Sequence, residues 1–351
     1  MAPLRLRHLH LPSIHPHYIP YRLASRVQEH LRRQHLDFKD GSAPDQPPPP
    51  TLLSFTPSPI YTLGRRQTAP LTQAEAVRLT APLQIPGHGT ADSQNGSSTG
   101  GVLIPPELIH SPRGGLTTYH GPGQVVLWPV LDLKSPSHKS FSVKCYARLL
   151  EETTIATLRS LFGIDAFTTD DPGVWVRVRR PIPSFTSPAQ GRKPGEPGEE
   201  GEAGGDRDGG ERAKIAALGV HLRRHVTALG TAINVAMPGP EVTDERVNPW
   251  ARIVACGLAG RGVTSVAGET SVKGEVASAS AASGGAGRER LVAGAWAGEL
   301  ARRIGLGAGG VEVVETGEVV RLMEALLLAA GGGGDETREE RGYVERMREG
   351  I

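Results

Sequence analysis

The stretch RGGLTTYHGPGQVVLWPVLDL, residues 113–133, decides the fold of this chain. Its second half, Val125–Leu133, is an apolar run that predicts a buried strand, interrupted by Pro129. Its first half holds four glycines, which let the backbone turn tightly and approach a bound group closely. The same loop gathers an arginine, two threonines, a tyrosine and a histidine. Two interpretations stay open: the loop binds a ligand, or it is a polar glycine loop between two strands.

Strands and helices are predicted on both sides of this stretch. Apolar residues recur at helical spacing over Ser142–Phe162, and Gly163 ends that helix. Thr72 and Glu75 form the sequence signature of a capping box at the start of a short helix. Further helices are predicted at 21–36, 292–304 and 320–330, and strands at 4–11, 51–63, 173–178, 214–220, 230–235 and 311–314.

Low-complexity segments interrupt the foldable part of this 351-residue chain, which contains 45 glycines and 29 prolines. Residues 86–101, 181–212 and 267–290 are predicted insertions, because they carry too little apolar area to offset the entropy of ordering them. Fewer than about 250 foldable residues remain, which predicts a single α/β or α+β domain over residues 1–330. Residues 331–351 are expected to be a mobile charged tail.

Composition argues against several classes of protein. The net charge of +2, from 39 lysines and arginines against 37 aspartates and glutamates, gives no electrostatic case for a nucleic-acid binder. No run of about 18 apolar residues exists, so we expect no membrane-spanning helix. Two cysteines exclude a disulfide-rich scaffold and a four-cysteine zinc site. We expect no metal site at the N-terminal histidines, which have no carboxylate or cysteine beside them: His8, His10, His15 and His17.

Cys256 ends an apolar stretch and precedes a glycine, in IVACGLAG (253–260). A tight turn there would aim backbone N–H groups at a developing oxyanion, and a thiolate beside a cation or base is a nucleophile. Lys214 opens an apolar strand, where a partly desolvated amine could exchange protons near neutral pH. The alternatives are a small buried cysteine and an ordinary surface lysine. Cys145, inside the helix at 142–162, is interpreted as structural.

Taken together, these segments resemble the lipoyl/octanoyl transferase family, the octanoyl-[acyl-carrier-protein]–protein transferases. The resemblance covers residues 4–305 apart from the insertions, and it implies a mixed β-sheet flanked by helices, like the catalytic domain of biotin and lipoate protein ligases. The insertions indicate a eukaryotic, fungal member. The segments that carry the resemblance are YTLGRR (61–66), RGGLTTYHGPGQVVLWPVLDL (113–133), GVWV (173–176), KIAALGVHLRR (214–224), TALGTAINV (227–235) and ACGLAG (255–260).

By this resemblance, Cys256 is the nucleophile that carries the acyl thioester, and Lys214 is the lysine that activates the thiol and shuttles protons. Two positions depart from the family pattern: Leu229 stands where histidine is usual, and His221 stands where arginine is usual. These departures put the fine shape of the pocket in doubt, but not the cysteine–lysine chemistry. Three segments match the walls of the acyl pocket: Arg113, Gly114, Gly115, Leu116, Thr117, Thr118, Tyr119 and His120; Ala217, Leu218 and Gly219; and Gly230, Thr231 and Ala232.

The resemblance implies transfer of an octanoyl (or lipoyl) group from acyl carrier protein to a lysine of lipoyl domains, through a thioester on Cys256. The implied partners are octanoyl-acyl carrier protein, the lipoyl domains of 2-oxoacid dehydrogenases and the glycine cleavage H protein. Because the phosphopantetheine thioester is already activated, no ATP or metal is expected. The lack of a heptad seam predicts a monomer. The alternatives are an ATP-dependent lipoate/biotin-type ligase, a non-catalytic binding homologue and a cysteine hydrolase.

The N-terminus is rich in arginine, and its first acidic residue is Glu29. Such a composition suits mitochondrial import. The strand predicted at 4–11 and the helix at 21–36 leave no room for a cleavable presequence. We therefore expect a mitochondrial protein on the strength of the family resemblance, with a weak targeting signal.

Overall fold

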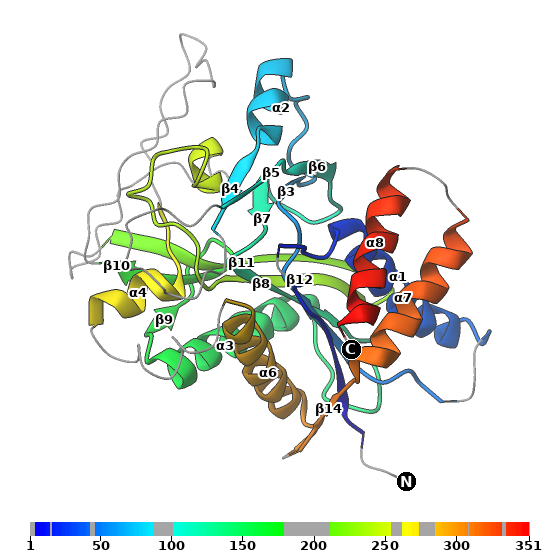
Figure 1. Cartoon of the computed structure of the whole chain (residues 1–351). Helices are drawn as coiled ribbons and strands as arrows, with labels where there is room; N and C mark the ends of the chain where they lie inside the picture. The colour runs from blue at the N-terminus through cyan, green and yellow to red at the C-terminus, as the bar shows by residue number, and fades with distance from the viewer. Residues whose placement is uncertain are drawn as a thin grey trace.

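The computed structural model describes residues 4–14, 16–42, 46–86, 101–178, 211–253, 262–273, 285–307, 309–331 and 335–350. A mixed sheet lies between two groups of helices (Figure 1). One face packs against α3 (Val143–Phe162) and α6 (Gly285–Ile304). The other packs against α1 (Tyr21–Lys39), α7 (Thr316–Ala330) and α8 (Asp335–Glu349). This arrangement confirms the predicted mixed sheet flanked by helices.

Within the described residues, nine strands form the main sheet, in the order β14-β1-β2-β8-β12-β11-β10-β9, with β13 paired to β11. The pairs β14–β1, β1–β2 and β11–β13 are parallel, and the remaining pairs are antiparallel. The strands are β1 (Leu6–Leu11), β2 (Thr51–Phe55), β8 (Gln124–Val130), β9 (Ala166–Phe167), β10 (Val174–Val178), β11 (Glu211–Arg223), β12 (Val226–Asn234), β13 (Gly262–Val263) and β14 (Val311–Val313).

The strand predicted after the glycine loop is β8, which lies between β2 and β12 and is buried along its whole length. Its side chains alternate between two cores. Val125 and Leu127 pack with α3 and α6, whereas Val126 and Trp128 pack with α1. Because burying such a side chain contributes roughly 1.5–3 kcal/mol, β8 joins both helical layers to one sheet.

Pro129 lies inside β8 although a proline cannot donate a hydrogen bond to a neighbouring strand. Thr227 of β12 compensates, because its Oγ1 donates to the Pro129 carbonyl at 2.8 Å and accepts from the Leu131 N–H at 2.9 Å. The strand therefore does not end at Pro129, because a buried hydroxyl bridges the position where the sequence predicts an interruption.

Two smaller sheets stand beside the main one, formed by β6-β3-β7 and by β4-β5. The single strand predicted at 51–63 is wrong, because prolines 57 and 59 divide it into β2 and β3, which belong to different sheets. The elements of this region are β3 (Ile60–Leu63), α2 (Gln73–Thr80), β4 (Leu83–Ile85), β5 (Val102–Ile104), β6 (Glu107–His110), β7 (Thr118–His120) and the short 3-10 helix η1 (Pro249–Arg252).

Helix ends follow the predicted signals. The Thr72 side chain accepts the Glu75 N–H, and the Glu75 carboxylate accepts the Thr72 N–H, which confirms the capping box. The Ser142 side chain accepts the backbone N–H of Cys145 at the start of α3. Gly163 ends that helix in the left-handed conformation, at φ 62°.

The C-terminal segment differs from the mobile tail expected at 331–351, because residues 335–349 form helix α8. Tyr343, Val344 and Met347 are buried, and the Tyr343 hydroxyl donates to the Pro12 carbonyl at 2.8 Å. These three side chains recur at helical spacing, a pattern hidden among the charged residues around them. A buried apolar stripe therefore anchors the segment.

Of the predicted insertions, 86–101 and 181–212 lie almost wholly outside the described residues. The insertion predicted at 267–290 is wrong at its two ends, where α4 (Val266–Lys273) and the first turns of α6 are helical. Alanine and glutamate, both good helix formers, lie among the glycines and serines there and favour helix at those ends.

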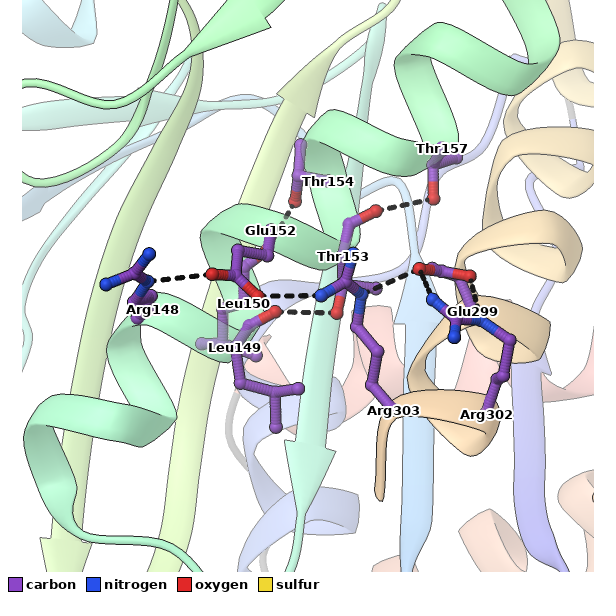
Figure 2. A network of polar contacts seen from close by, with 10 residues as sticks. All are labelled: Arg148, Leu149, Leu150, Glu152, Thr153, Thr154, Thr157, Glu299, Arg302 and Arg303. Atoms are coloured by element: carbon purple, nitrogen blue, oxygen red, sulfur yellow. Dashed lines mark hydrogen bonds and ion pairs between the residues drawn. The ribbon is translucent and has the colours of Figure 1, made fainter. Parts of the chain in front are cut away.

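The two helices on the first face of the sheet are joined by a network of polar contacts (Figure 2). Glu152 of α3 accepts from Arg148 and from Arg303 of α6, each at 2.7 Å. Glu299 accepts in turn from Arg303 at 2.6 Å and from Arg302 at 2.7 Å. The network lies at the edge of an interface whose centre is apolar.

Candidate active site

A pocket opens between the N-terminal end of α1 and three strands of the main sheet, with an empty volume of about 400 Å³ counted out to its mouth. All three predicted walls contribute to it. The first wall contributes Arg113, Thr118 and His120; the second contributes Ala217, Leu218 and Gly219; the third contributes Gly230, Thr231 and Ala232; and Tyr21, Val126, Trp128 and Leu229 complete the lining.

Arg113 lies at the base of the glycine loop with only 8% of its surface exposed. Its Nη1 donates to the Gly114 carbonyl at 2.9 Å and to the Leu116 carbonyl at 2.8 Å. Its Nη2 donates to the carbonyl and hydroxyl of Thr62, at 2.6 and 2.8 Å. The guanidinium therefore fastens the loop to β3, and these bonds use all four of its terminal N–H donors.

Gly219 of β11 leaves the space that the Arg113 side chain occupies. A Cβ added at Gly219 would lie 2.8 Å from Cδ of Arg113, well inside ordinary contact distance. The second wall thus needs a glycine at this position because the arginine stem packs directly on the strand.

His120, at the end of β7, stacks on Tyr21 of α1 with ring centres 6.2 Å apart and ring planes 15° apart. Tyr21 in turn meets Trp128 edge-on, at 5.2 Å. Burial, and after it the positive charge of Arg113, lower the pKa of His120 to about 3. The imidazole is therefore neutral at physiological pH, and the aromatic rings hold its plane.

A β-bulge decides which way Lys214 points. Val174 of β10 pairs with Ala216, but the next residue, Trp175, pairs with Lys214, so β11 has one extra residue here. Neighbouring residues on β10 point to opposite faces, so Lys214 and Ala216 do too. Ala216 packs into the core under α3 and α6, so Lys214 lies on the other face, shared with Ala217 of the pocket.

The Lys214 amine is buried and held by a defined set of neighbours. Nζ donates to the Pro172 carbonyl at 2.9 Å and lies 4.7 Å from the centre of the Trp175 ring. Gly173, between those residues, has φ +127°, and a Cβ there would lie 2.7 Å from the Ala216 carbonyl oxygen and 3.2 Å from Cε of Lys214. Only 7% of Lys214 is exposed, so the surface-lysine interpretation is wrong.

Cys256 lies outside the described residues, but both flanks of its segment are described. Before it, Trp250 packs edge-on against Tyr119, with ring centres 5.8 Å apart. After it, the Thr264 N–H donates to the carbonyl of Lys214 at 3.0 Å. The chain thus enters this segment beside the core under the glycine loop and leaves it beside the buried lysine.

Five predicted residues of the glycine loop are absent from the pocket lining. Tyr119 points to the opposite side of β7, where it is 1% exposed and packs on Tyr61 with ring centres 5.3 Å apart. In the turn before Tyr119, two backbone carbonyls accept hydrogen bonds from Arg113, so this turn stabilises the loop and does not line the pocket. That turn comprises Gly114, Gly115, Leu116 and Thr117.

Sequence reasoning missed four lining residues. Val126 and Trp128 could have been found, because they alternate along β8 with residues of the opposite core. Tyr21 gives no such signal, since it lies some ninety positions before the loop that it meets. Leu229 was named only as a departure from the family pattern, and His221, the other departure, lies outside the pocket lining.

Leu229 adopts φ +61°, a left-handed backbone conformation that costs free energy in a residue with a branched side chain. Its N–H donates to Oε1 of Gln28, a buried residue of α1, at 3.1 Å. The helix therefore holds this strained residue at the pocket wall.

Two observations concern only the described part of the chain. There, no three histidine, cysteine, aspartate or glutamate side chains gather in a way that could hold a metal ion. None of the helices in the same residues is both long and apolar enough to cross a bilayer.

The described residues form a mixed sheet with a pocket and a buried lysine on the same face. Residues 92–281 match the family model described as the lipoyl protein ligase A/B catalytic domain. The chain belongs to this family.

Several curated proteins are similar to this chain over most of its length. A probable octanoyltransferase of Schizosaccharomyces pombe is 31% identical over 70% of this chain and 80% of its own length. The mitochondrial octanoyl-[acyl-carrier-protein]:protein N-octanoyltransferase of Danio rerio is 32% identical over 73% and 81%. Among solved structures, a bi-partite lipoate protein ligase of Thermoplasma acidophilum aligns with a TM-score of 0.45 and 14% identity, over 92% of this chain and 90% of that one.

Proposed function

We propose that this protein is an octanoyltransferase, which moves an octanoyl group from acyl carrier protein to a lysine of lipoyl domains. The observation that carries the proposal is that three predicted wall segments, far apart in the sequence, meet at one pocket on the face of β11 that carries Lys214. The names of the fungal and zebrafish relatives support the activity.

The first half-reaction acylates Cys256. Its thiolate attacks the carbonyl carbon of the octanoyl thioester, a new C–S bond forms, and the bond to the pantetheine sulfur breaks. Lys214 gives a proton to the departing pantetheine thiolate. No nucleotide is needed, because the thioester donor is already activated.

The second half-reaction releases the acyl group to the acceptor. The amine of the lipoyl-domain lysine attacks the acyl-Cys256 carbonyl and forms an amide, and the cysteine sulfur leaves as a thiolate. Lys214 accepts the proton that the attacking amine loses. The scheme is ping-pong, with one covalent intermediate between two substrates.

The pocket supplies the site for the acyl chain. Val126, Trp128 and Leu229 give it an apolar lining. Each buried methylene contributes about 0.8 kcal/mol, so the depth of the pocket sets the preferred chain length.

The proposed function also implies the acceptor proteins, the oligomeric state and the location of the enzyme. The acceptors are the lipoyl domains of 2-oxoacid dehydrogenases and the glycine cleavage H protein, and the protein acts as a monomer without ATP or a metal. Mitochondrial localisation is supported by the zebrafish relative and by a similar octanoyltransferase of Saccharomyces cerevisiae, both of which are named as mitochondrial.

The test is intact-mass analysis after incubation with octanoyl-acyl carrier protein, without ATP. The wild-type protein is expected to gain one octanoyl group, and a Cys256→Ser variant is expected to gain none and to lose transfer to a lipoyl domain. Cys145 is the matched control, because it is the other cysteine of the chain and is exposed. A Cys145→Ser variant keeps both the adduct and the activity. An adduct that persists in Cys256→Ser, or transfer that begins only when ATP and free octanoate are added, contradicts the proposal.

A further inference from the structure

Two buried amide side chains link His120 at the pocket to the strand end beside Lys214. Gln124, at the start of β8, is fully buried, and Asn234, at the end of β12, is 3% exposed. Oε1 of Gln124 lies 3.3 Å from Nδ1 of His120, and Nε2 of Gln124 donates to Oδ1 of Asn234 at 2.8 Å. Nδ2 of Asn234 donates to the Thr264 carbonyl at 2.9 Å.

The Thr264 carbonyl, at the end of this hydrogen-bond network, fixes the orientation of both amide groups. The Thr264 carbonyl can only accept a hydrogen bond, so Asn234 must turn its NH₂ group towards it. Oδ1 of Asn234 then faces Gln124 and requires a donor, which is the Gln124 NH₂ group. Oε1 of Gln124 therefore faces His120, and as an acceptor it requires a proton on Nδ1.

A neutral imidazole carries a single N–H, and His120 is neutral for the reasons given above. If that proton lies on Nδ1, then Nε2 holds a bare lone pair. Within the described residues, the contacts of the His120 ring are with Gln124 and Tyr21, and the ring lines the pocket. Nε2 is thus the ring nitrogen left for a ligand, and it can only accept a hydrogen bond.

We propose that Gln124 and Asn234 are positioning residues that fix neutral His120 with its proton on Nδ1, so that Nε2 accepts a hydrogen bond from an N–H group of the bound substrate. The identity of that substrate rests on the proposed function. The proposed reaction brings two such groups to the site, an amide N–H of the pantetheine arm on the donor and the amine of the attacking lysine on the acceptor. A free carboxylate offers only lone pairs to Nε2 and is disfavoured at this position.

The proton position can be measured directly by NMR on the full-length protein labelled with ¹⁵N-histidine, because the protonated and bare ring nitrogens differ in chemical shift and in their couplings to the ring protons. The His120 signals are identified by their loss in a His120→Gln variant. In the wild type, the proton is expected on Nδ1. A proton on Nε2 overturns the proposal, and this measurement needs no variant to be active.

Two substitutions test the positioning residues. Gln124→Leu removes the acceptor opposite Nδ1, so the ring is expected to populate both neutral forms. Gln124→Glu keeps an acceptor opposite Nδ1 but loses the donor to Oδ1 of Asn234, so a proton is expected on Nδ1 although the bond to Asn234 is lost. Thr157→Val is the control, because it deletes a buried hydroxyl that bonds within α3, at 2.8 Å from the Thr153 carbonyl. A proton that stays wholly on Nδ1 in Gln124→Leu overturns the role of Gln124. If that variant does not fold, Asn234→Asp replaces it, because the substitution puts an oxygen against the Thr264 carbonyl. An unchanged His120 spectrum in Asn234→Asp would contradict the proposed network.

Kinetics separate the two possible N–H donors. Octanoyl-N-acetylcysteamine carries one amide, and the octanoyl thioester of ethanethiol carries none. If the arm is the donor, Gln124→Leu is expected to raise KM for the amide-bearing thioester about tenfold and to leave the other unchanged, as loss of one hydrogen bond implies. If the lysine is the donor, only the second half-reaction slows, by a similar factor. Unchanged kinetics of Gln124→Leu in both half-reactions overturn the role proposed for His120. The proposed function is then still tested by Cys256→Ser. Conversely, failure of the Cys256→Ser test leaves the proton position measurable.

Discussion

The two faces of the main sheet are built in different ways. Beneath α3 and α6 the face is an apolar core that includes the fully buried Trp296, and the arginines that join the two helices lie at its edge (Figure 2). On the pocket face, an arginine, a lysine and two amides are buried at the centre beside a partly exposed histidine, and each is held by named partners. The first face is stabilised by buried area and tolerates polar change at its edge. The second depends on directional hydrogen bonds, so small substitutions there should have large effects.

Lys214→Met is the substitution expected to have the largest effect. Methionine keeps most of the apolar stem but removes the amine that donates to the Pro172 carbonyl. Loss of a general acid and base typically costs 10²–10⁴-fold, so the rate of octanoyl transfer should fall by about that factor while the fold persists. The rate is measured with octanoyl-acyl carrier protein and a lipoyl domain, and the fold by circular dichroism. A variant within threefold of the wild-type rate would show that Lys214 is not the general acid and base.

Arg113→Lys tests the clamp on the glycine loop. Lysine keeps the charge, but it cannot reach the Gly114, Leu116 and Thr62 acceptors together. Loss of several buried hydrogen bonds is expected to lower the free energy of unfolding by about 3 kcal/mol and to raise KM for the donor. Urea unfolding measures the first and steady-state kinetics the second. Arg302→Lys, at an exposed site on the other face, serves as the control and should leave both unchanged.

Local patterns in the sequence predicted many of the strands and helices, whereas the arrangement of the sheet and the walls of the pocket were implied by the resemblance to the family. A continuous apolar run predicted β8, helical spacing predicted α3 and α6, and the capping box predicted α2. The glycine-rich motif located the loop that forms the first wall. Each of these signals lies within about twenty residues of chain, so no knowledge of distant contacts was required.

The features that escaped prediction depend on contacts between distant parts of the chain. The bulge that turns Lys214 to the pocket face is visible only in the pairing with β10. Tyr21 reaches the pocket because α1 crosses the sheet there, and Gln28 meets Leu229 for the same reason. The apolar stripe around Tyr343 is too sparse to stand out in a charged segment. Tertiary packing decides each of these cases.

Glu289 is a buried carboxyl of α6 that should give the stability of the protein a pH dependence. This α6 residue is 8% exposed, and burial raises its pKa to about 7, with hydrogen bonds to Thr56 and the Gly123 backbone opposing the rise. Between its ordinary value of 4.5 and about 7, the folded protein binds more protons than the unfolded chain. This carboxyl's contribution is therefore complete below pH 4.5 and is lost as the pH rises through 7.

Glu289→Gln is expected to remove this dependence. Relative to the wild type, the variant should gain roughly 2–3 kcal/mol of stability between pH 4.5 and pH 8, measured by urea unfolding across that range. Comparing the two proteins matters, because the lowered pKa of buried His8, about 4, makes stability fall in the opposite direction, as the pH drops below 6.5. Parallel stability curves for the two proteins would contradict the assignment.

Glu299→Gln should have the smallest effect, although this carboxylate pairs with two arginines. It accepts from Arg302 and Arg303 at the edge of the α3–α6 interface (Figure 2), and these partners hold its pKa below the ordinary value. Because the pairs lie near solvent, each contributes less than about 1 kcal/mol and is screened by salt. The variant is expected to lose about 0.5 kcal/mol in low salt and less at 1 M salt, with kcat/KM unchanged. A loss of several kcal/mol that persists in high salt would mean that this face, too, depends on directional polar contacts, and the contrast between the two faces would fail.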